Sequence, residues 1–426
     1  MSSFLYTFYT RKTKWRKPLN INDRITIILG AGAMVEATTL SCASITAKVI
    51  EKQQREFVNG EFAAIPLLKI IYEKLLMYHG TADEAVNFED IFHVLEMWNS
   101  LLTAQNPKVQ KRFRSIFGML GDLKEDLTKY SSMLLYSGMS SLIDTVIALI
   151  AENENRISEN EWFSNFLEAI VQQSPVDVFS LNYDTWVEQT LQKYNDGFVP
   201  ISETYQRFSA NHLFDQDSVT STINHLHGQI CFTHHRPPNH GGLDIGELYK
   251  VANYDVIKSL KVLPQNIGTM YTTQSAEQIF QYPIITGLRK NDKILLPPFD
   301  AYYSHLYQQI KNNRKLMIIG YGFGDLYINS LLSQFRNFHG NDGKIICIDY
   351  ISPQKWTHNF YEMPISQTMK QVVYKMFCDE KMPYRFLGFD RLDFIDSEDC
   401  KNRLYCCGFH AASTKYKDDI LHFYLD

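Results

Sequence analysis

Two short polar motifs in this chain carry side chains that could perform acid–base chemistry on a bound substrate. The Asn-Tyr-Asp motif at 182–184 follows an apolar run and supplies an amide, which both donates and accepts hydrogen bonds, and a carboxylate. The His-Leu-His-Gly motif at 225–228 ends on a histidine, the usual acid–base residue near neutral pH, and a glycine that permits close approach. The first motif could instead be a turn that caps a helix, and His225 is best interpreted as structural. The candidate catalytic residues are Asn182, Asp184 and His227.

Three other strand ends offer groups that could hold a nucleotide. A Gly-Ala-Gly-Ala turn at 30–33 would present backbone N–H groups at a helix start, where they and the helix dipole favour a pyrophosphate. A full dinucleotide fingerprint needs a third glycine where Val35 stands. A second Gly-rich turn ends at Asp325, which we expect to cap the next helix, and Asp349 could bind ribose hydroxyls. Each feature could also serve packing or a turn alone. The predicted nucleotide-binding residues are Gly30, Ala31, Gly32, Ala33, Gly320, Gly322 and Asp349.

The histidines and cysteines do not form a recognised metal site. Cys231, His234, His235 and His240 follow His227 closely, but their spacing fits no zinc pattern. The chain has 7 cysteines, an odd number at scattered positions, and none forms a CxxC pair. We therefore predict no metal, and we expect reduced thiols in a cytoplasm.

The motifs are separated by short apolar runs that lack polar alternation, which is typical of strands buried on both faces of a parallel sheet. The predicted strands are Ile25–Leu29, Val176–Leu181, Thr222–His227, Pro283–Thr286, Leu316–Ile319 and Lys344–Asp349. A long helix is expected from Val35 to about Phe57. This order predicts an α/β fold, a Rossmann-like doubly wound parallel sheet with a large all-helical insertion.

The predicted organisation has four parts. Residues 24–60 and 174–352 would form the sheet domain, with 229–315 as a capping segment, and 61–173 the helical insertion. The apolar stripes of the insertion are interpreted as core, or in part as a subunit interface. Residues 1–23 form an N-terminal arm whose basic and aromatic residues could be solvated, dock on a neighbouring subunit or contact nucleic acid. Residues 353–426 form a C-terminal region of mixed structure, with a helix near 367–377.

Composition excludes several classes of protein. The chain has 426 residues, 45% of them hydrophobic, which excludes a disordered protein. A formal net charge of -5 argues against broad nucleic-acid binding, which needs a surplus of basic side chains. We find no signal peptide and no run of about 18 consecutive apolar residues. The expectation is a soluble, cytoplasmic protein without membrane or direct nucleic-acid contact.

The order of the motifs resembles that of the sirtuin family. Gly-Ala-Gly, Asn-Tyr-Asp, His-Gly, a Gly-rich turn and an acidic strand end follow one another as they do in sirtuins, over roughly 24–57, 176–228 and 315–350. More narrowly, the chain is similar to the sirtuin-like NADases of bacterial anti-phage defence, and its size suggests the partner of a HerA-type ATPase. Sirtuin deacylases carry Gly-Ile-Pro-Asp-Phe-Arg after the first turn, where this chain has Met-Val-Glu-Ala at 34–37. They also carry a four-cysteine zinc module, where this chain has Cys231 alone.

The resemblance implies NAD as substrate and hydrolysis of its nicotinamide–ribose bond. Asn182 would orient a water and the ribose, His227 would act as general base, and Asp184 would contact the nicotinamide carboxamide or support the ribose. The turn at 30–33 would hold the pyrophosphate, and Gly320, Gly322 and Asp349 would face the adenosine half. A homo-oligomer controlled by assembly or by the ATPase is expected. The alternatives are a non-catalytic sensor of NAD or ADP-ribose, and a protein deacylase or ADP-ribosyltransferase.

Overall fold

The structure is a computed structural model, and it describes most of the chain. The N-terminal arm at 1–23, Cys378, His235 and His240 lie outside the described residues. The described residues are 24–58, 61–79, 86–103, 131–215, 219–234, 247–259, 269–272, 278–287, 290–352, 360–363, 365–377, 386–387, 393–397 and 399–424.

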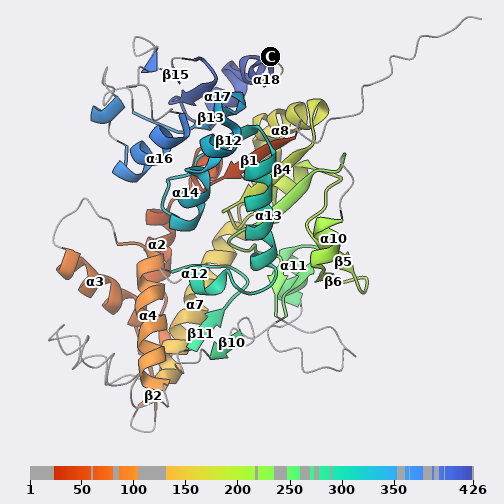
Figure 1. The fold of residues 1–426 in the computed structure, drawn as a ribbon. Coiled ribbons are helices and arrows are strands. Elements are labelled where there is room, and N and C mark those ends of the chain that lie inside the picture. Colours follow the sequence, from red (N-terminus) through yellow and green to blue (C-terminus); the bar gives the residue numbers. More distant parts are fainter. Residues whose placement is uncertain are drawn as a thin grey trace, which may run out of the picture.

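An eight-stranded, mostly parallel sheet forms the centre of the described structure (Figure 1). Its strand order is β14-β15-β16-β13-β12-β1-β4-β7, and the six strands from β16 to β7 run parallel. Their bounds are β1 Ile25–Leu29, β4 Val176–Ser180, β7 Thr222–His225, β12 Lys315–Ile319, β13 Lys344–Ile348 and β16 Asn402–Tyr405. The first described strand, β1, is central. Strands β4 and β7 follow on one side of it, and β12, β13 and β16 follow on the other. This order confirms the Rossmann-like doubly wound fold and places its switch point between β1 and β12.

Both faces of the sheet are covered, which explains the continuous apolar strands. Ile28 and Ile318 face a core shared with α13 (Phe299–Asn312), α14 (Leu326–Leu332) and α16 (Gln367–Phe377). Ile27 and Met317 face a second core on the other side. That core includes residues of α1 (Gly32–Thr38), α8 (Glu161–Gln173), α9 (Trp186–Thr190), α17 (Phe409–Lys415) and α18 (Lys417–Phe423). In Figure 1 the two groups of helices lie on opposite sides of the sheet.

The predicted long helix between Val35 and Phe57 is wrong. Helix α1 ends at Thr38 because Thr39 adopts a left-handed conformation (φ 59°), and α2 (Cys42–Ile50) starts afresh behind the Ser41–Ser44 capping box. A hairpin of β2 (Gln54–Val58) and β3 (Glu61–Ile65) then follows. This hairpin crosses the boundary predicted at residue 60, so the insertion begins with strands and is not all-helical.

The insertion is otherwise helical in its described residues. It contains α3 (Leu67–His79), α4 (Phe88–Thr103), α7 (Ser132–Ala151) and a 3-10 segment at Glu154–Glu159. Its apolar stripes form a third core, in which α4 and α7 pack together with α2. Helix α7 and the 3-10 segment after it (Ser132–Glu159) are long and apolar enough to cross a membrane. However, 56% of the most apolar stretch of this segment is buried inside the protein.

The capping segment and the C-terminal region are built differently from the prediction. No strand forms at Pro283–Thr286. Ile284 makes an isolated bridge with Gly228 instead. The segment contributes β8 (Phe232–Thr233) and β9 (Tyr249–Val251) to a small sheet with β5 (Phe198–Pro200) and β6 (Tyr205–Phe208). The C-terminal region adds β16 and the antiparallel β15 (Phe394–Ser397) and β14 (Phe386–Leu387) to the main sheet, while its predicted helix is confirmed as α16.

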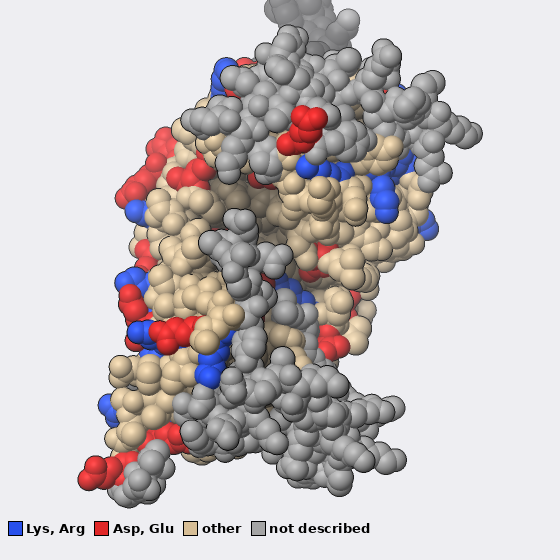
Figure 2. Space-filling view, turned by 90° about the vertical axis from the view of Figure 1, so that its left-hand side faces the viewer, with Lys and Arg blue, Asp and Glu red and all other residues tan. Residues whose placement is uncertain are grey.

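The remaining described elements connect these parts. They are α10 (Ala210–Phe214), α11 (Tyr254–Ser259), α12 (Lys290–Lys293), α15 (Phe335–His339), β10 (Thr269–Thr272), β11 (Gln278–Gln281), and 3-10 turns at Gly340–Asp342 and Phe360–Glu362. On the face shown in Figure 2, acidic and basic side chains alternate along one edge, so the described part of this face presents mixed charge.

Candidate functional site

The two glycine turns lie against each other because β1 and β12 are neighbours. The N–H of Gly30 donates to the carbonyl of Ile319, and the N–H of Gly32 donates to the carbonyl of Gly320, both at 2.8 Å. A Cβ on Gly320, whose φ is +59°, would lie 2.0 Å from the nitrogen of Ala33. Packing between the turns therefore accounts for Gly30, Gly32 and Gly320. A role of the 30–33 turn in holding pyrophosphate stays a prediction, since the N–H groups of Gly32 and Ala33 already donate within the protein.

The second turn opens beyond Gly320. A Cβ on Gly322 or Gly324 would meet no heavy atom within 4 Å in the described structure. Asp325 then caps α14 as predicted, because its Oδ1 accepts hydrogen bonds from the N–H groups of Tyr327 (2.9 Å) and Ile328 (3.1 Å). The open backbone around Gly322 thus lies at the switch point, where ligands bind in open α/β sheets.

Asn182 is a buried side chain whose amide is not satisfied by the described protein. It lies directly beyond β4 and is 6% exposed, and neither its Oδ1 nor its Nδ2 has a hydrogen-bond partner among the described residues. Its backbone N–H donates to the hydroxyl of Ser180 at 3.1 Å, which fixes the loop. A buried amide without partners costs free energy, of the order of 1–3 kcal/mol for each group. Such a side chain at a strand end indicates a place where a ligand or water completes the bonding.

His227 lies at the same level on the neighbouring strand. Ser180 pairs with His225 in the β4–β7 register, so Asn182 and His227 each lie two residues beyond that pair. His227 is also buried, and its Nε2 lies 3.4 Å from Oδ2 of Asp325. Burial and the nearby Lys290 lower the pKa of His227, while Asp325 opposes them. Burial acts to raise the pKa of Asp325, but the contact with His227 and a backbone N–H bring it below its ordinary value.

A carboxylate only accepts hydrogen bonds, so its contact favours the His227 tautomer with hydrogen on Nε2. That tautomer leaves Nδ1 with a lone pair. Burial and Lys290 lower the pKa of His227 below its ordinary value, which favours the neutral ring. His227 therefore has the chemical state that a general base requires.

One segment of the capping region holds both motifs in place. The N–H of Ile285 donates to the carbonyl of His227 at 2.7 Å, and the hydroxyl of Tyr183 donates to the carbonyl of Ile285 at 3.0 Å. Gly228 has a φ of +80°, and a Cβ there would lie 2.0 Å from the carbonyl oxygen of Pro283. Gly228 thus permits the close approach of the Pro283 backbone, which is part of the same protein.

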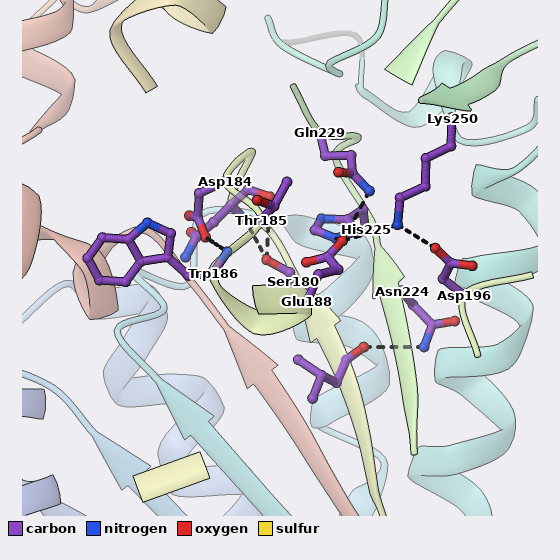
Figure 3. Close-up of polar contacts among 12 residues, drawn as sticks. Ser180, Asp184, Thr185, Trp186, Glu188, Asp196, Asn224, His225, Gln229 and Lys250 are labelled. Atoms are coloured by element: carbon purple, nitrogen blue, oxygen red, sulfur yellow. Dashed lines mark hydrogen bonds and ion pairs between the residues drawn. The ribbon is translucent and has the colours of Figure 1, made fainter. Parts of the chain in front are cut away.

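Asp184 points to a different group of residues. Its Oδ1 accepts from the N–H of Trp186 at 3.2 Å, in a local turn just before α9, whose N-cap is Thr185. Burial raises the pKa of Asp184 to about 6, and the charged neighbours that act on it are His225 and Glu188. Figure 3 shows Asp184 beside Trp186, with Glu188 and His225 nearby. The catalytic role of Asp184 stays a prediction.

Behind the strand ends lies a buried ion cluster of Glu188, His225, Gln229, Lys250 and Asp196 (Figure 3). His225 Nε2 lies 2.7 Å from Glu188, and Lys250 lies 2.6 Å from Asp196. Burial acts to lower the pKa of His225, but Glu188 raises it above its ordinary value. His225 is thus ion-paired inside the protein, in agreement with its interpretation as a structural histidine.

Asp349 lies directly beyond β13, beside the second glycine turn. Its Oδ1 accepts from the N–H of Tyr350 at 2.8 Å, and burial raises its pKa. No ion pair to Asp349 occurs among the residues that the structure describes. Its position agrees with a ribose contact, which stays a prediction.

The sequence did not reveal three charged residues around His227. Asp325 was expected only as a cap, and Lys290 of α12 and Glu89 of α4 follow no strand. Lys290 and Glu89 form an ion pair of 2.9 Å, and both act electrostatically on His227. Side chains of the capping segment and of the insertion thus reach the site. No local sequence pattern indicates that these residues would lie near His227. Within the described ranges, no group of three or more His, Cys, Asp or Glu side chains could hold a metal ion.

Comparison with known proteins gives one match. A family model described as a SIR2-like domain matches residues 176–362. No curated protein matches the chain. The match begins at β4 and contains Asn182, His227, Gly322 and Asp349, whereas β1 and its glycine turn precede it. Residues 176–362 are therefore similar to a SIR2-like domain, and this similarity points to NAD binding and to an NAD-using enzyme.

Proposed function

We propose that the protein is an NAD glycohydrolase that releases nicotinamide and ADP-ribose. The observation that carries the proposal is the pairing of an unsatisfied buried amide, Asn182, with a neutral buried imidazole, His227, at adjacent ends of parallel strands. A pure binding site has no need of a base at this position. The SIR2-like match supplies the substrate class.

The proposed reaction builds positive charge on the ribose as the glycosidic bond breaks. The pyridinium leaving group is already cationic and departs as neutral nicotinamide without a proton. The electron pair of the broken bond goes to the nicotinamide ring nitrogen. Asn182 is suited to orient the ribose and an attacking water. His227 is suited to accept one proton from that water, through Nδ1, as the new C–O bond forms.

The pyrophosphate and adenosine would lie across the switch point. The open backbone at Gly322 supports this placement because no side chain of the described structure fills it. Asp349 would accept hydrogen bonds from ribose hydroxyls. Asp184 would contact the nicotinamide carboxamide or support the ribose, while its Oδ1 also accepts from the N–H of Trp186.

The test is nicotinamide release from NAD by the purified chain, with and without a HerA-type ATPase, beside Asn182→Ala. The matched control is Asn211→Ala, which removes an exposed amide from α10. Release that disappears in Asn182→Ala and persists in Asn211→Ala supports the proposal. Binding of NAD or ADP-ribose without release under either condition would favour a sensor instead.

We also propose that the protein works as a homo-oligomer in anti-phage defence, under control of a HerA-type ATPase. The resemblance to defence NADases supports this. Large apolar side chains are exposed on the insertion, such as Met77 (81%) and Met133 (80%), and could contact a second copy. Sedimentation at micromolar concentration should show more than a monomer, and a monomer alone would contradict the oligomer.

A further inference from the structure

A pocket lies beside the helical insertion, formed by residues other than those of the candidate active site. It has a volume of about 900 Å³ and lies between α7, the start of the β2–β3 hairpin and α11. In Figure 1, β2 and α7 lie together at the end of the molecule away from the main sheet. Its size falls within the range of small-molecule sites, which is roughly 300–1,000 Å³.

The inner wall of the pocket carries an unsatisfied polar group. Gln54 lines the pocket and is 2% exposed. Its Oε1 has no hydrogen-bond partner in the described structure, while its Nε2 lies 3.5 Å from Ser141. Ser140 also lines the pocket, but its hydroxyl interacts with the buried hydroxyl of Tyr282. Native proteins satisfy almost all buried polar atoms, so Gln54 indicates a bond made to something else.

Asp144 adds an acidic group to the same wall. It lies four residues after Ser140 on α7, hence on the same helix face. Its carboxylate makes no hydrogen bond or ion pair with any described residue, and burial raises its pKa to about 7. The inner wall thus offers acceptors, Asp144 and Gln54, to a ligand that donates hydrogen bonds.

The remaining lining residues define the rest of the ligand. Tyr136 and Tyr254 line the pocket and offer rings against which a planar group could stack. Lys52 and Arg55 are exposed at its rim, and neither forms an ion pair with the described residues. Cations at the rim favour an anionic group at the outer end of the ligand. A planar, amine-bearing group joined to an anion is the chemistry of a nucleotide.

We propose that this pocket is a second small-molecule site, which binds a nucleotide whose base carries an exocyclic amine. The base lies toward Asp144 and Gln54, and the phosphates lie toward Lys52 and Arg55. The site is separate from the proposed NAD site, and the proposal does not depend on NAD hydrolysis.

The first test is calorimetric titration of the full chain with ADP and with inosine diphosphate, which lacks the amine. ADP should bind at least about tenfold more tightly, because a hydrogen bond to a charged group contributes roughly 1.5–3 kcal/mol. Asp144→Leu, which has no acceptor, should remove this preference, and Arg55→Glu should weaken both ligands. Glu51→Gln, an exposed acid just outside the pocket, should change neither. Equal affinity for the two nucleotides in the unmodified chain, or no binding, would overturn the proposal.

The second test locates the nucleotide, because ADP could also enter the strand-end site. Photolabelling with 8-azido-ADP should mark peptides of α7, β2 or α11, and this label should be lost in Asp144→Leu and kept in Glu51→Gln. Label confined to the strand-end peptides would overturn the proposal. Asp144→Leu should fold at least as well as the unmodified chain at pH 8, because burial disfavours the charged carboxylate. Its melting temperature therefore separates lost binding from lost folding.

Discussion

His227 and Asp325 are 98 residues apart in the chain, yet Nε2 of one lies 3.4 Å from Oδ2 of the other. His227 follows β7, and Asp325 caps α14 after β12. Since β4 and β1 lie between those two strands in the sheet, the contact joins the two sides of the switch point. Asn182 and the first glycine turn extend from the intervening strands, so they lie at the same edge of the sheet as this pair.

Removal of the imidazole should abolish most turnover without unfolding the protein. We expect His227→Ala to lower the rate of nicotinamide release by roughly 10²–10⁴-fold, the usual contribution of a general base. Asp325→Asn should cause a smaller loss, because the ring remains but its tautomer is less well fixed. The control is His212→Ala, an exposed histidine of α10. A His227→Ala rate equal to that of the control would contradict the assignment.

The pH profile should report the state of His227. A base is active when neutral, so kcat/KM should rise with pH through the pKa of His227, which burial and Lys290 hold below its ordinary value. Asp325→Asn removes a group that raises this pKa and should move the rise to lower pH. Lys290→Met removes a cation that lowers it and should move the rise to higher pH. Profiles measured between about pH 5 and pH 8 that coincide for all three proteins would exclude His227 as the titrating group.

Two glycines of one turn should respond differently to alanine. Gly320→Ala forces a Cβ to within 2.0 Å of the nitrogen of Ala33 at a left-handed φ, so it should lower the melting temperature and the yield of folded protein. Gly322→Ala has space and should fold normally, but it should raise the KM for NAD if the nucleotide lies against this backbone. Gly324→Ala, which also has open space, is the comparison. An unchanged KM in Gly322→Ala would remove Gly322 from the binding site.

A buried ion pair at the opposite end of the strands should support the fold alone. Arg24 and Asp177 lie 2.6 Å apart, with side chains 9% and 0% exposed. Asp177→Ala leaves the guanidinium buried without its partner and should cost about 3–5 kcal/mol of unfolding free energy. Glu51→Ala, which breaks the exposed Lys48–Glu51 pair, should cost less than about 1 kcal/mol. Urea denaturation of the two variants provides the measurement, and equal midpoints would contradict the prediction.

The sequence alone determined five strands of the main sheet, β1, β4, β7, β12 and β13, and the strand ends that carry its polar residues. Apolar runs such as Ile25–Leu29 are buried on both faces of the sheet. A continuous apolar composition therefore predicts a strand of a parallel sheet. Asn182 and His227 were recognisable because each follows such a run. The break after α1 was missed, because it depends on a left-handed Thr39 and a serine capping box and not on the apolar pattern.

Tertiary structure decided which of these residues meet. Asp184 satisfies a local turn, whereas Asp325 reaches His227, and Lys290 and Glu89 arrive from segments that carry no strand-end signal. The C-terminal β16 completes the parallel sheet by pairing with β13, although more than fifty residues separate them. A sequence pattern records the burial of each segment, because burial constrains residue type locally. It does not record partners, because pairing depends on the strand order and on packing between distant segments.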